Sequence, residues 1–422
     1  MQPEVNVPFQ IIEHTIGFFD GDIPSLATCS LICRDLLPVC RTHIWRDIAL
    51  PIGARYPGSS TQSPRTAAFL EVIDADPVVA LYVHALSLDL RYSDGSAEIR
   101  GHKRRNRTTV YEVLIAIARD FPLLEALHLE NANIEDQDGG ERGDLRSLAT
   151  STNRARWALK KLAIVEGLVP ATLLSELVAF LGQSADLVSL QSLDLRSPIL
   201  SRDSILQVWP NVLPFASSLL HLGIALNDVG PVELQDVSIT PFDKVYKHRI
   251  ERVLSTLPQC GSLQSLCLQY DLFESFFLVS YTNSDNMFPA SPPIPSPSFL
   301  DLFSDVLSAP GEHPLRCLER LSLVFISPPH WLADFHASFH KLAEALVDGL
   351  DDARSDGAEM RKFPRFSRLD VRMSILQTVQ TLWGERGIGE YRARWDVVKR
   401  DLILPMLAPF ARAGVAVEIV LE

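Results

Sequence analysis

The chain has 422 residues, of which 47% are hydrophobic and 22% charged, and its formal net charge is -13 at pH 7. This composition is typical of a soluble folded protein that buries one large core or two to three smaller ones. The excess of acidic residues disfavours a protein that wraps a polyanion with its whole surface.

The first residues, MQPEVNVPFQIIEH, contain no basic start followed by an apolar core, so we expect no secretory signal. Polar residues interrupt every apolar run before it reaches the roughly 20 residues that a membrane helix needs. Six cysteines without a secretory signal indicate reduced thiols. We therefore expect an intracellular protein, cytoplasmic or nuclear, with no membrane partner.

Residues 7–50 are predicted to form a small helical unit. The stretch VPFQIIEHTIGFF has apolar residues at helical spacing, and the turn DGDIP follows it. Further on, five residues spaced three or four apart fall on one face of a helix: Leu26, Cys29, Cys33, Leu36 and Cys40. Because proline breaks a helix interior, we expect one helix to end near Leu37 and another to begin at Pro38. The pattern predicts three short helices.

The cysteines of this stretch have two interpretations. Cys29, Cys33 and Cys40, with His43, offer metal ligands, but zinc sites usually pair Cys-x2–4-Cys with a second matching pair, and none follows. Cysteine also packs as a small hydrophobe in protein cores. Core packing is the favoured interpretation, and we expect neither a metal nor a cofactor.

The rest of the chain repeats one phrase, apolar-x-x-Leu-x-apolar. Its Leu-x-apolar ending has period two, which predicts a short strand with one buried face. The central leucines are Leu86, Leu127, Leu162, Leu193, Leu222, Leu266, Leu321 and Leu369. Segments with helical character precede most copies, and AVEIVL (416–421) is a plausible ninth strand.

Alternating helix and strand with a recurring leucine pattern predicts an α/β fold with a curved parallel sheet and outer helices. The leucine spacing varies from 29 to 55 residues. Regular leucine-rich repeats run about 20–29 residues, so the array is irregular and contains insertions. We expect a helical domain over residues 1–50 and a degenerate leucine-rich-repeat-like domain over 51–422.

Three stretches are predicted to be loops: 93–108, 135–146 and the Pro- and Ser-rich segment 282–298, which we expect to be disordered or extended. The basic run KRRNR (103–107) lies in the first of them. A solvated loop is the favoured interpretation and a nuclear signal the alternative. Because no aromatic residues interleave with the basic ones, nucleic acid is disfavoured as a partner.

The N-terminal unit resembles an F-box. Val7-Pro8-Phe9-Gln10-Ile11-Ile12 stands where that family has Leu-Pro-x-Glu-Ile/Leu and an apolar helix. Cys29-Ser30-Leu31-Ile32-Cys33-Arg34 is similar to its frequent Cys-Ser-Leu-Val-Cys-Arg, and Trp45-Arg46-Asp47-Ile48 to its usual close. Val7 for Leu and Gln10 for the acidic residue are departures. An F-box before irregular leucine-rich repeats is abundant in mushroom-forming fungi.

The resemblance implies the substrate-recognition subunit of an SCF-type ubiquitin ligase. The F-box would dock on the Skp adaptor, and through it on a cullin, while the repeat array would hold an unknown target protein. Such a subunit is a non-catalytic adaptor that contributes proximity. The Skp-binding residues that the resemblance implies are Val7, Pro8, Ile11, Ile12, Leu31, Ile32 and Trp45. For the target-binding face, the residues beside the leucines are candidates: His128, Asp194, Gln264, Cys267 and Gln269.

Enzyme motifs are absent: the chain contains no Gly-x-Gly-x-x-Gly, no Gly-x4-Gly-Lys-Ser/Thr and no Gly-x-Ser-x-Gly. His336 and His340 are one helical turn apart, near His330 and Asp334, but no Glu follows the first to complete His-Glu-x-x-His. We favour a helix face without metal. The alternatives to a ligase subunit are a repeat scaffold without ligase coupling and a nuclear or nucleic-acid binder directed by the basic loop.

Overall fold

The computed structural model describes fourteen segments of the chain. They are residues 9–32, 34–51, 64–89, 121–130, 159–165, 175, 190–196, 209–226, 251–271, 298–308, 315–326, 335–347, 363–374 and 395–421. The expected loops 93–108 and 135–146, the basic run 103–107 and residues 282–297 lie outside them, as do Val7, Pro8, Cys33, His330 and Asp334.

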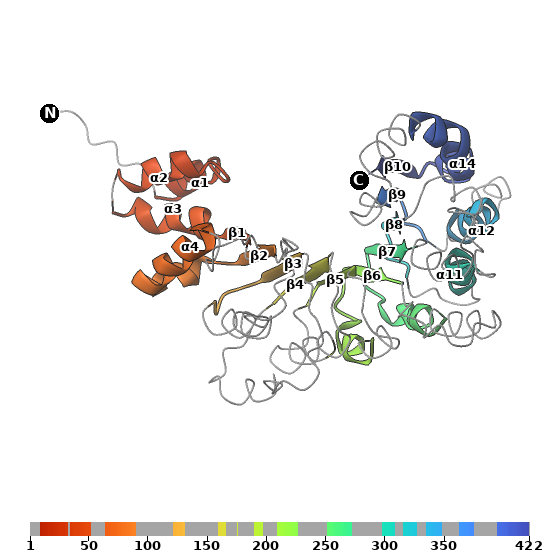
Figure 1. The fold of residues 1–422 in the computed structure, drawn as a ribbon, viewed down its shortest axis with the longest axis horizontal. Helices are drawn as coiled ribbons and strands as arrows, with labels where there is room; N and C mark the ends of the chain where they lie inside the picture. The colour runs from red at the N-terminus through yellow and green to blue at the C-terminus, as the bar shows by residue number, and fades with distance from the viewer. Residues whose placement is uncertain are drawn as a thin grey trace, which may run out of the picture. The chain divides into compact units, whose positions relative to one another are not determined.

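Within these segments, ten strands form the sheet in chain order, and each pair whose register is described is parallel (Figure 1). Their bounds are β1 Asp47–Pro51, β2 Ala85–Asp89, β3 Ala126–Glu130, β4 Lys161–Val165, β5 Ser192–Arg196, β6 His221–Ala225, β7 Ser265–Asp271, β8 Arg320–Ile326, β9 Arg368–Ser374 and β10 Ala416–Leu421. The α/β class with a parallel sheet is confirmed, and every copy of the leucine phrase forms a strand.

One strand was not expected. The sequence predicts a helical unit over residues 7–50, whereas β1 pairs with β2 from Asp47 onward. The backbone carbonyl of Arg46 accepts hydrogen bonds from the His84 and Ala85 amides, at 2.9 and 2.8 Å. The same arrangement recurs at the start of later strands, where the Gln264 carbonyl accepts from the Glu319 and Arg320 amides. The helical unit therefore runs directly into the sheet.

The leucines of the phrase form the core because alternate strand residues point to opposite faces. The central leucines of all eight copies are at most 2% exposed. The first apolar residue of most copies is buried as well, as Leu124 and Leu263 show. The residues between the leucines consequently lie on the opposite face.

Contacts between residues divide the chain into two compact units. The first is Met1–Leu168 with Phe180–Leu190, and the second is Val169–Ala179 with Gln191–Glu422. The boundary expected at residue 50 therefore falls within the first unit.

The first unit begins with three helices, α1 (Phe9–Gly17), α2 (Ile23–Ser30) and α3 (Leu36–Trp45). The predicted break at Pro38 is wrong: α2 already ends at Ser30, and α3 includes Pro38 in its first turn. A first-turn amide has no helical acceptor, so proline is tolerated there. Asp22 caps α2 by accepting a hydrogen bond from the Ser25 amide.

The interior of this helical trio is small. Four residues form its buried cluster, Ile16, Leu26, Leu36 and Cys40, and Ile12, Cys29, Val39 and Ile44 pack against it. Helix α4 (Pro64–Ala75) and a 3-10 helix η1 (Pro77–Tyr82) follow β1.

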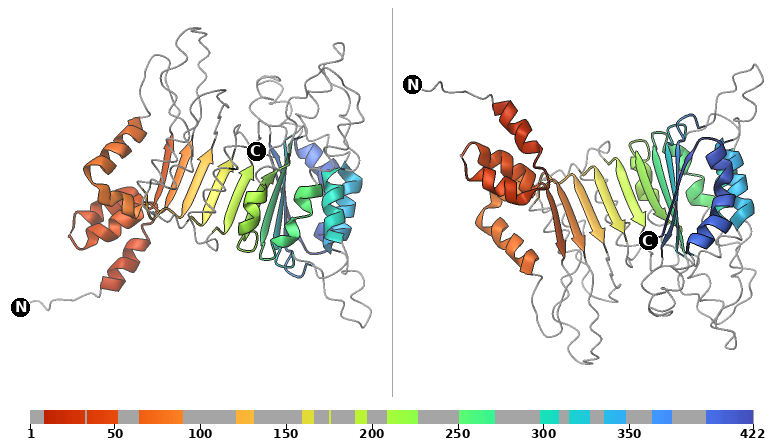
Figure 2. Two further views of the ribbon diagram at one scale, coloured as in Figure 1. Left: turned by 90° about the horizontal axis from the view of Figure 1, so that it is seen from below. Right: turned by 90° about the horizontal axis from the view of Figure 1, so that it is seen from above.

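In the second unit, helices α11 (Phe299–Ser308), α12 (His336–Val347) and α14 (Leu404–Arg412) lie side by side along one face of the last strands (Figures 1 and 2). A π-helical turn, Lys399–Ile403, leads into α14, and short 3-10 turns cover Leu213–Phe215 and Leu257–Gln259. Ser298, expected to belong to a loop, instead caps α11: its hydroxyl accepts from the Asp301 amide, and its amide donates to the Asp301 carboxylate.

Aromatic rings fill the space between these helices and the sheet. Phe325 of β8 packs against three rings of the helical side, Phe299, Phe335 and Phe339, with centroids 5.9 to 6.0 Å apart. All four side chains are at most 1% exposed. The C-terminal core is therefore closed and aromatic.

Candidate functional site

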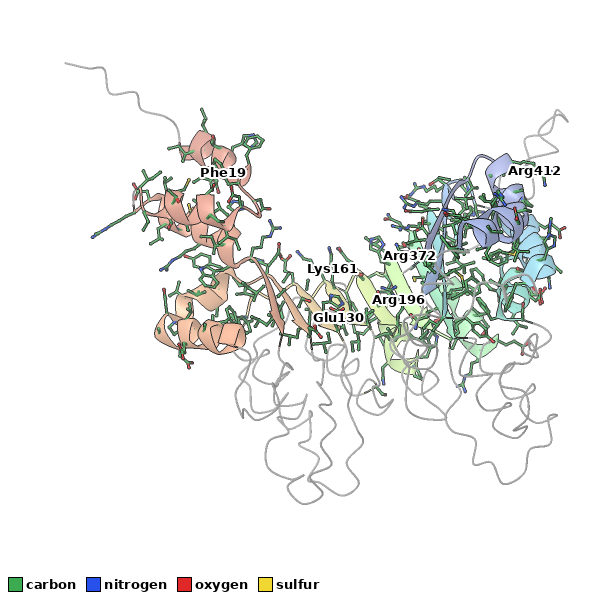
Figure 3. The ribbon with its side chains drawn as sticks, turned by 45° about the horizontal axis from the view of Figure 1, so that its top comes forward. Phe19, Glu130, Lys161, Arg196, Arg372 and Arg412 are labelled. Carbon is green, nitrogen blue, oxygen red and sulfur yellow. The ribbon has the colours of Figure 1, made fainter. Side chains whose placement is uncertain are left out.

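Polar residues line up across the strands on the sheet face opposite the leucines. Because the strands are parallel and in register, one position of the phrase forms a row from β5 to β10: Asp194, Gly223, Cys267, Ser322, Asp370 and Glu418. Figure 3 shows Arg196 and Arg372 on strands of this face, whereas Arg412 lies on α14 in the helix layer. The parallel register gathers polar groups that are far apart in the sequence.

An open hollow lies in this face over β5 to β9. Its lining residues are Ser192, Leu193, Asp194, Arg196, His221, Leu222, Gly223, Ser265, Cys267, Arg320, Ser322 and Arg372. The charged ones are three arginines and a single aspartate. In a chain with a net charge of -13, the sign of the local charge is reversed here.

One edge of the hollow is formed by an ion pair that lies over a glycine of the neighbouring strand. Arg196 Nε donates to Asp194 Oδ1 and Arg196 Nη2 to Asp194 Oδ2, both at 2.8 Å. The Asp194 carboxylate leans over Gly223 of β6. A Cβ at Gly223 would lie 2.3 Å from Asp194 Oδ1, so only glycine leaves room for the carboxylate in this position.

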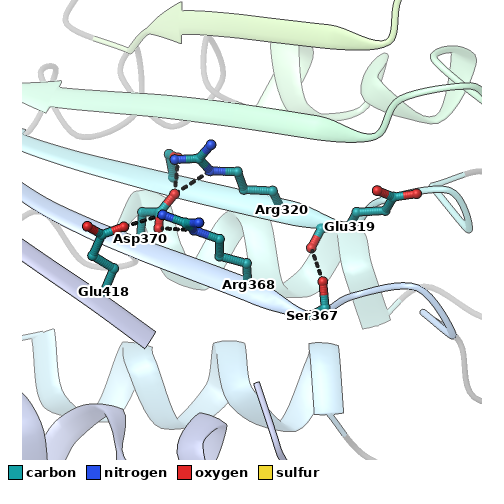
Figure 4. A network of polar contacts seen from close by, with 7 residues as sticks. Glu319, Arg320, Ser367, Arg368, Asp370 and Glu418 are labelled. Atoms are coloured by element: carbon teal, nitrogen blue, oxygen red, sulfur yellow. Dashed lines mark hydrogen bonds and ion pairs between the residues drawn. The ribbon is translucent and has the colours of Figure 1, made fainter. Parts of the chain in front are cut away.

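The other edge contains a buried carboxylate between two arginines (Figure 4). Asp370 is fully buried, and it accepts from Arg368 Nε at 2.8 Å, from the Ser322 hydroxyl at 3.1 Å and from Arg320 Nε. Arg368 also pairs with Glu418 of β10. Burial favours a raised pKa for Asp370, but the hydrogen bonds from Arg368 and Arg320 outweigh it and hold the pKa below the ordinary value. Asp370 is therefore ionised at neutral pH and fixes both guanidinium groups.

The floor between these edges is small and neutral. Gly223, Ser265, Cys267 and Ser322 come from β6, β7 and β8. Burial raises the pKa of the Cys267 thiol to about 11, so the thiol is protonated at neutral pH. The floor therefore offers hydroxyl and thiol groups and no charge of its own.

Of the residues suggested for the target-binding face, two line the hollow, Asp194 and Cys267. Gln269 lies on β7, directly after the leucine phrase, and is buried. Gln264 precedes the strand. His128 lies on β3 of the first unit, where its Nε2 atom is buried and has no hydrogen-bond partner among the described residues.

The arginines of the hollow were not singled out from the sequence. Arg196, Arg320 and Arg372 each occupy a position next to the leucine pattern, on the sheet face opposite the leucines. The alternation of residues along each strand could have placed these arginines on that face. Many other residues share this property, however, and which of them come together depends on which strands become neighbours.

The helical trio exposes several of the residues that the F-box resemblance implies. Ile11 is 56%, Leu31 86% and Ile32 70% exposed. Ile12 instead packs against the trio's buried cluster, and the half-buried Trp45 lies 6.2 Å from the Phe69 ring. Phe18 and Ile23 add to the exposed apolar surface.

The cysteines and histidines considered for metal binding have other neighbours. Cys40 is buried in the trio's cluster with Cys29 packed against it, and His43 Nδ1 lies 3.2 Å from Asp20 Oδ1. His336 and His340 are neighbours on α12, with ring centroids 4.6 Å apart and ring planes inclined at 45°. Within the described segments, no three His, Cys, Asp or Glu side chains gather in a way that could hold a metal ion.

No protein-family model and no curated protein matches the chain. None of the helices in the described part of the chain combines the length and the apolar character that crossing a membrane requires.

Proposed function

We propose that this chain is a non-catalytic adaptor, the substrate-recognition subunit of an SCF-type ubiquitin ligase. The helical trio docks on a Skp-like adaptor, which connects it to a cullin, and the sheet face opposite the buried leucines binds a target protein. The chain itself makes and breaks no bonds in this role; it brings the target close to the ubiquitin-charged enzyme.

One observation carries the proposal. Among its described residues, the trio has a cluster of four buried side chains, yet it leaves Ile11, Leu31 and Ile32 more than half exposed. Large exposed apolar side chains on a small helical unit are typical of a protein interaction site. The F-box resemblance of residues 29–34 supplies the kind of partner, since Leu31 and Ile32 are the middle residues of that motif.

The test is co-expression with a Skp protein followed by co-purification. The wild type is expected to form a stable complex, and the double variant Leu31→Asp, Ile32→Asp is expected to lose it. Both side chains are exposed, so the variant should fold normally, as thermal unfolding would verify.

Val397→Asp is the matched control, because Val397 is 49% exposed but belongs to the second unit. It should leave the complex intact. If the folded wild type fails to co-purify with Skp, the ligase role is rejected, and a repeat scaffold without ligase coupling becomes the better description of the chain.

A further inference from the structure

The hollow over β5 to β9 collects positive charge on an acidic protein. Its lining contains Arg196, Arg320 and Arg372, against Asp194 in the lining and Asp370 buried beside it. With both carboxylates counted, the arginines are still in excess among the described residues. An anionic ligand is therefore favoured here over a neutral or cationic one.

The shape of the hollow fits a peptide better than a small ion. Arg196 belongs to β5 and Arg320 to β8, three strand spacings away. Neighbouring strands lie about 4.8 Å apart, so the backbones of these two strands are separated by roughly 14 Å. Between them the floor consists of the small residues Gly223, Ser265 and Cys267. A segment of chain lying across the strands would place an acidic side chain near an arginine at each edge.

Asp194 shows which kind of group the Arg196 edge of the hollow can bind. Its carboxylate binds Arg196 in the two-pronged geometry that guanidinium groups form with planar oxyanions. It reaches this position only because Gly223 lacks a side chain. Asp194 thus acts as an internal carboxylate in the place where a ligand's oxyanion would bind.

We propose that this hollow binds an acidic segment of a partner protein, and that an oxyanion of the segment replaces Asp194 on Arg196. Arg320 and Arg372 hold a second acidic group at the opposite edge, with Arg320 kept in position by Asp370. The inference rests on the proposed function in one respect, that the sheet face opposite the buried leucines is the target-binding surface. It names the chemical class of the target segment.

The experiment measures binding of fluorescein-labelled peptides to the full chain by fluorescence anisotropy. The probes are a hexaglutamate peptide, the same peptide with two glutamates replaced by phosphoserine, and hexaglutamine. The wild type is expected to bind both acidic peptides and not hexaglutamine. Because the measurement needs no Skp, a failure here leaves the Skp test unaffected, and the reverse holds as well.

Two variants of opposite sign test the role of Asp194. Arg196→Gln should weaken binding of the acidic peptides by about tenfold, the effect expected for the loss of one charge-assisted, two-pronged contact. Asp194→Asn keeps the side-chain shape and removes the competing carboxylate, so it should tighten binding several-fold. If Arg196→Gln folds poorly, the isosteric Asp194→Asn still decides the question.

Arg412→Gln is the matched control, because it removes the same charge from α14 in the helix layer. It should leave binding unchanged. The inference is overturned if Arg412→Gln and Arg196→Gln weaken binding equally, if Asp194→Asn has no effect, or if no acidic peptide binds. Tighter binding of the phosphoserine peptide would identify phosphate as the preferred oxyanion, and tighter binding of hexaglutamate would identify carboxylate. Either result supports the site.

Discussion

The N-terminal trio and the C-terminal helix layer use their apolar residues in opposite ways. In the C-terminal layer, Phe299 and Phe339 are fully buried against Phe325 of the sheet. In the trio, by contrast, Leu31 and Ile32 face solvent around a cluster of four buried residues. An apolar side chain buried within its own chain stabilises the fold, whereas an exposed apolar side chain can contact a partner protein. The comparison predicts which substitutions affect folding and which affect only binding.

The largest effect is expected for Phe325→Ala. Its ring contacts three other buried rings, and truncating a fully buried phenylalanine typically costs about 3–5 kcal/mol. Urea unfolding measures the loss of stability, and hydrogen exchange should show that the backbone amides of α11 and α12 lose protection in the variant. Retention of wild-type stability would mean that the aromatic cluster does not hold the second unit together.

Asp370→Asn is expected to cost about 2 kcal/mol at neutral pH, since it removes the buried negative charge with which two arginines pair. The folded-state pKa of Asp370 is lowered from 3.8, so its stabilising contribution is present above that pH and is lost as the pH falls through the lowered value.

Unfolding curves from pH 7 down to pH 2 measure this contribution. The difference between wild type and Asp370→Asn should be constant near neutrality and shrink on acidification below about pH 4. A difference that grows on acidification would contradict the arrangement of these ion pairs.

Cys40→Ser is expected to destabilise the trio by about 1–2 kcal/mol, because it places a hydroxyl in a cluster of apolar residues. Cys29→Ser should cost less, since Cys29 is only partly buried. Thermal unfolding measures both variants. A chelator should leave the wild-type transition unchanged; a shift on adding it would favour the metal interpretation of these cysteines.

The smallest effect is expected for Leu31→Asp, whose side chain is 86% exposed. Surface substitutions of this kind usually change stability by less than about 0.5 kcal/mol. The thermal transition should therefore match that of the wild type, and the Skp complex should weaken. A clear loss of stability would show that Leu31 packs within the chain, which would remove the contrast between the two regions.

The strands were predictable because they depend on local patterns. Each Leu-x-apolar ending specifies a strand with one buried face, and all eight copies formed one. The helix bounds near Pro38 were not, since the first turn of a helix accepts proline and nothing in the local sequence says whether Leu36 starts that turn. Strand β1 was missed because DIALP has a single short apolar alternation, and its pairing with β2 makes it a strand.

The sequence by itself determined the α/β class and the buried leucines of this protein, because the leucine periodicity acts within a few residues. It also determined the acidic balance, because net charge is a sum over the residues. The tertiary structure alone decided which side chains share a site. Arg196 and Arg372 lie 176 positions apart in the chain, and they meet at one hollow because parallel strands in register place equivalent positions side by side. The position of Asp194 over Gly223 likewise depends on the pairing of β5 with β6, which neither strand specifies alone.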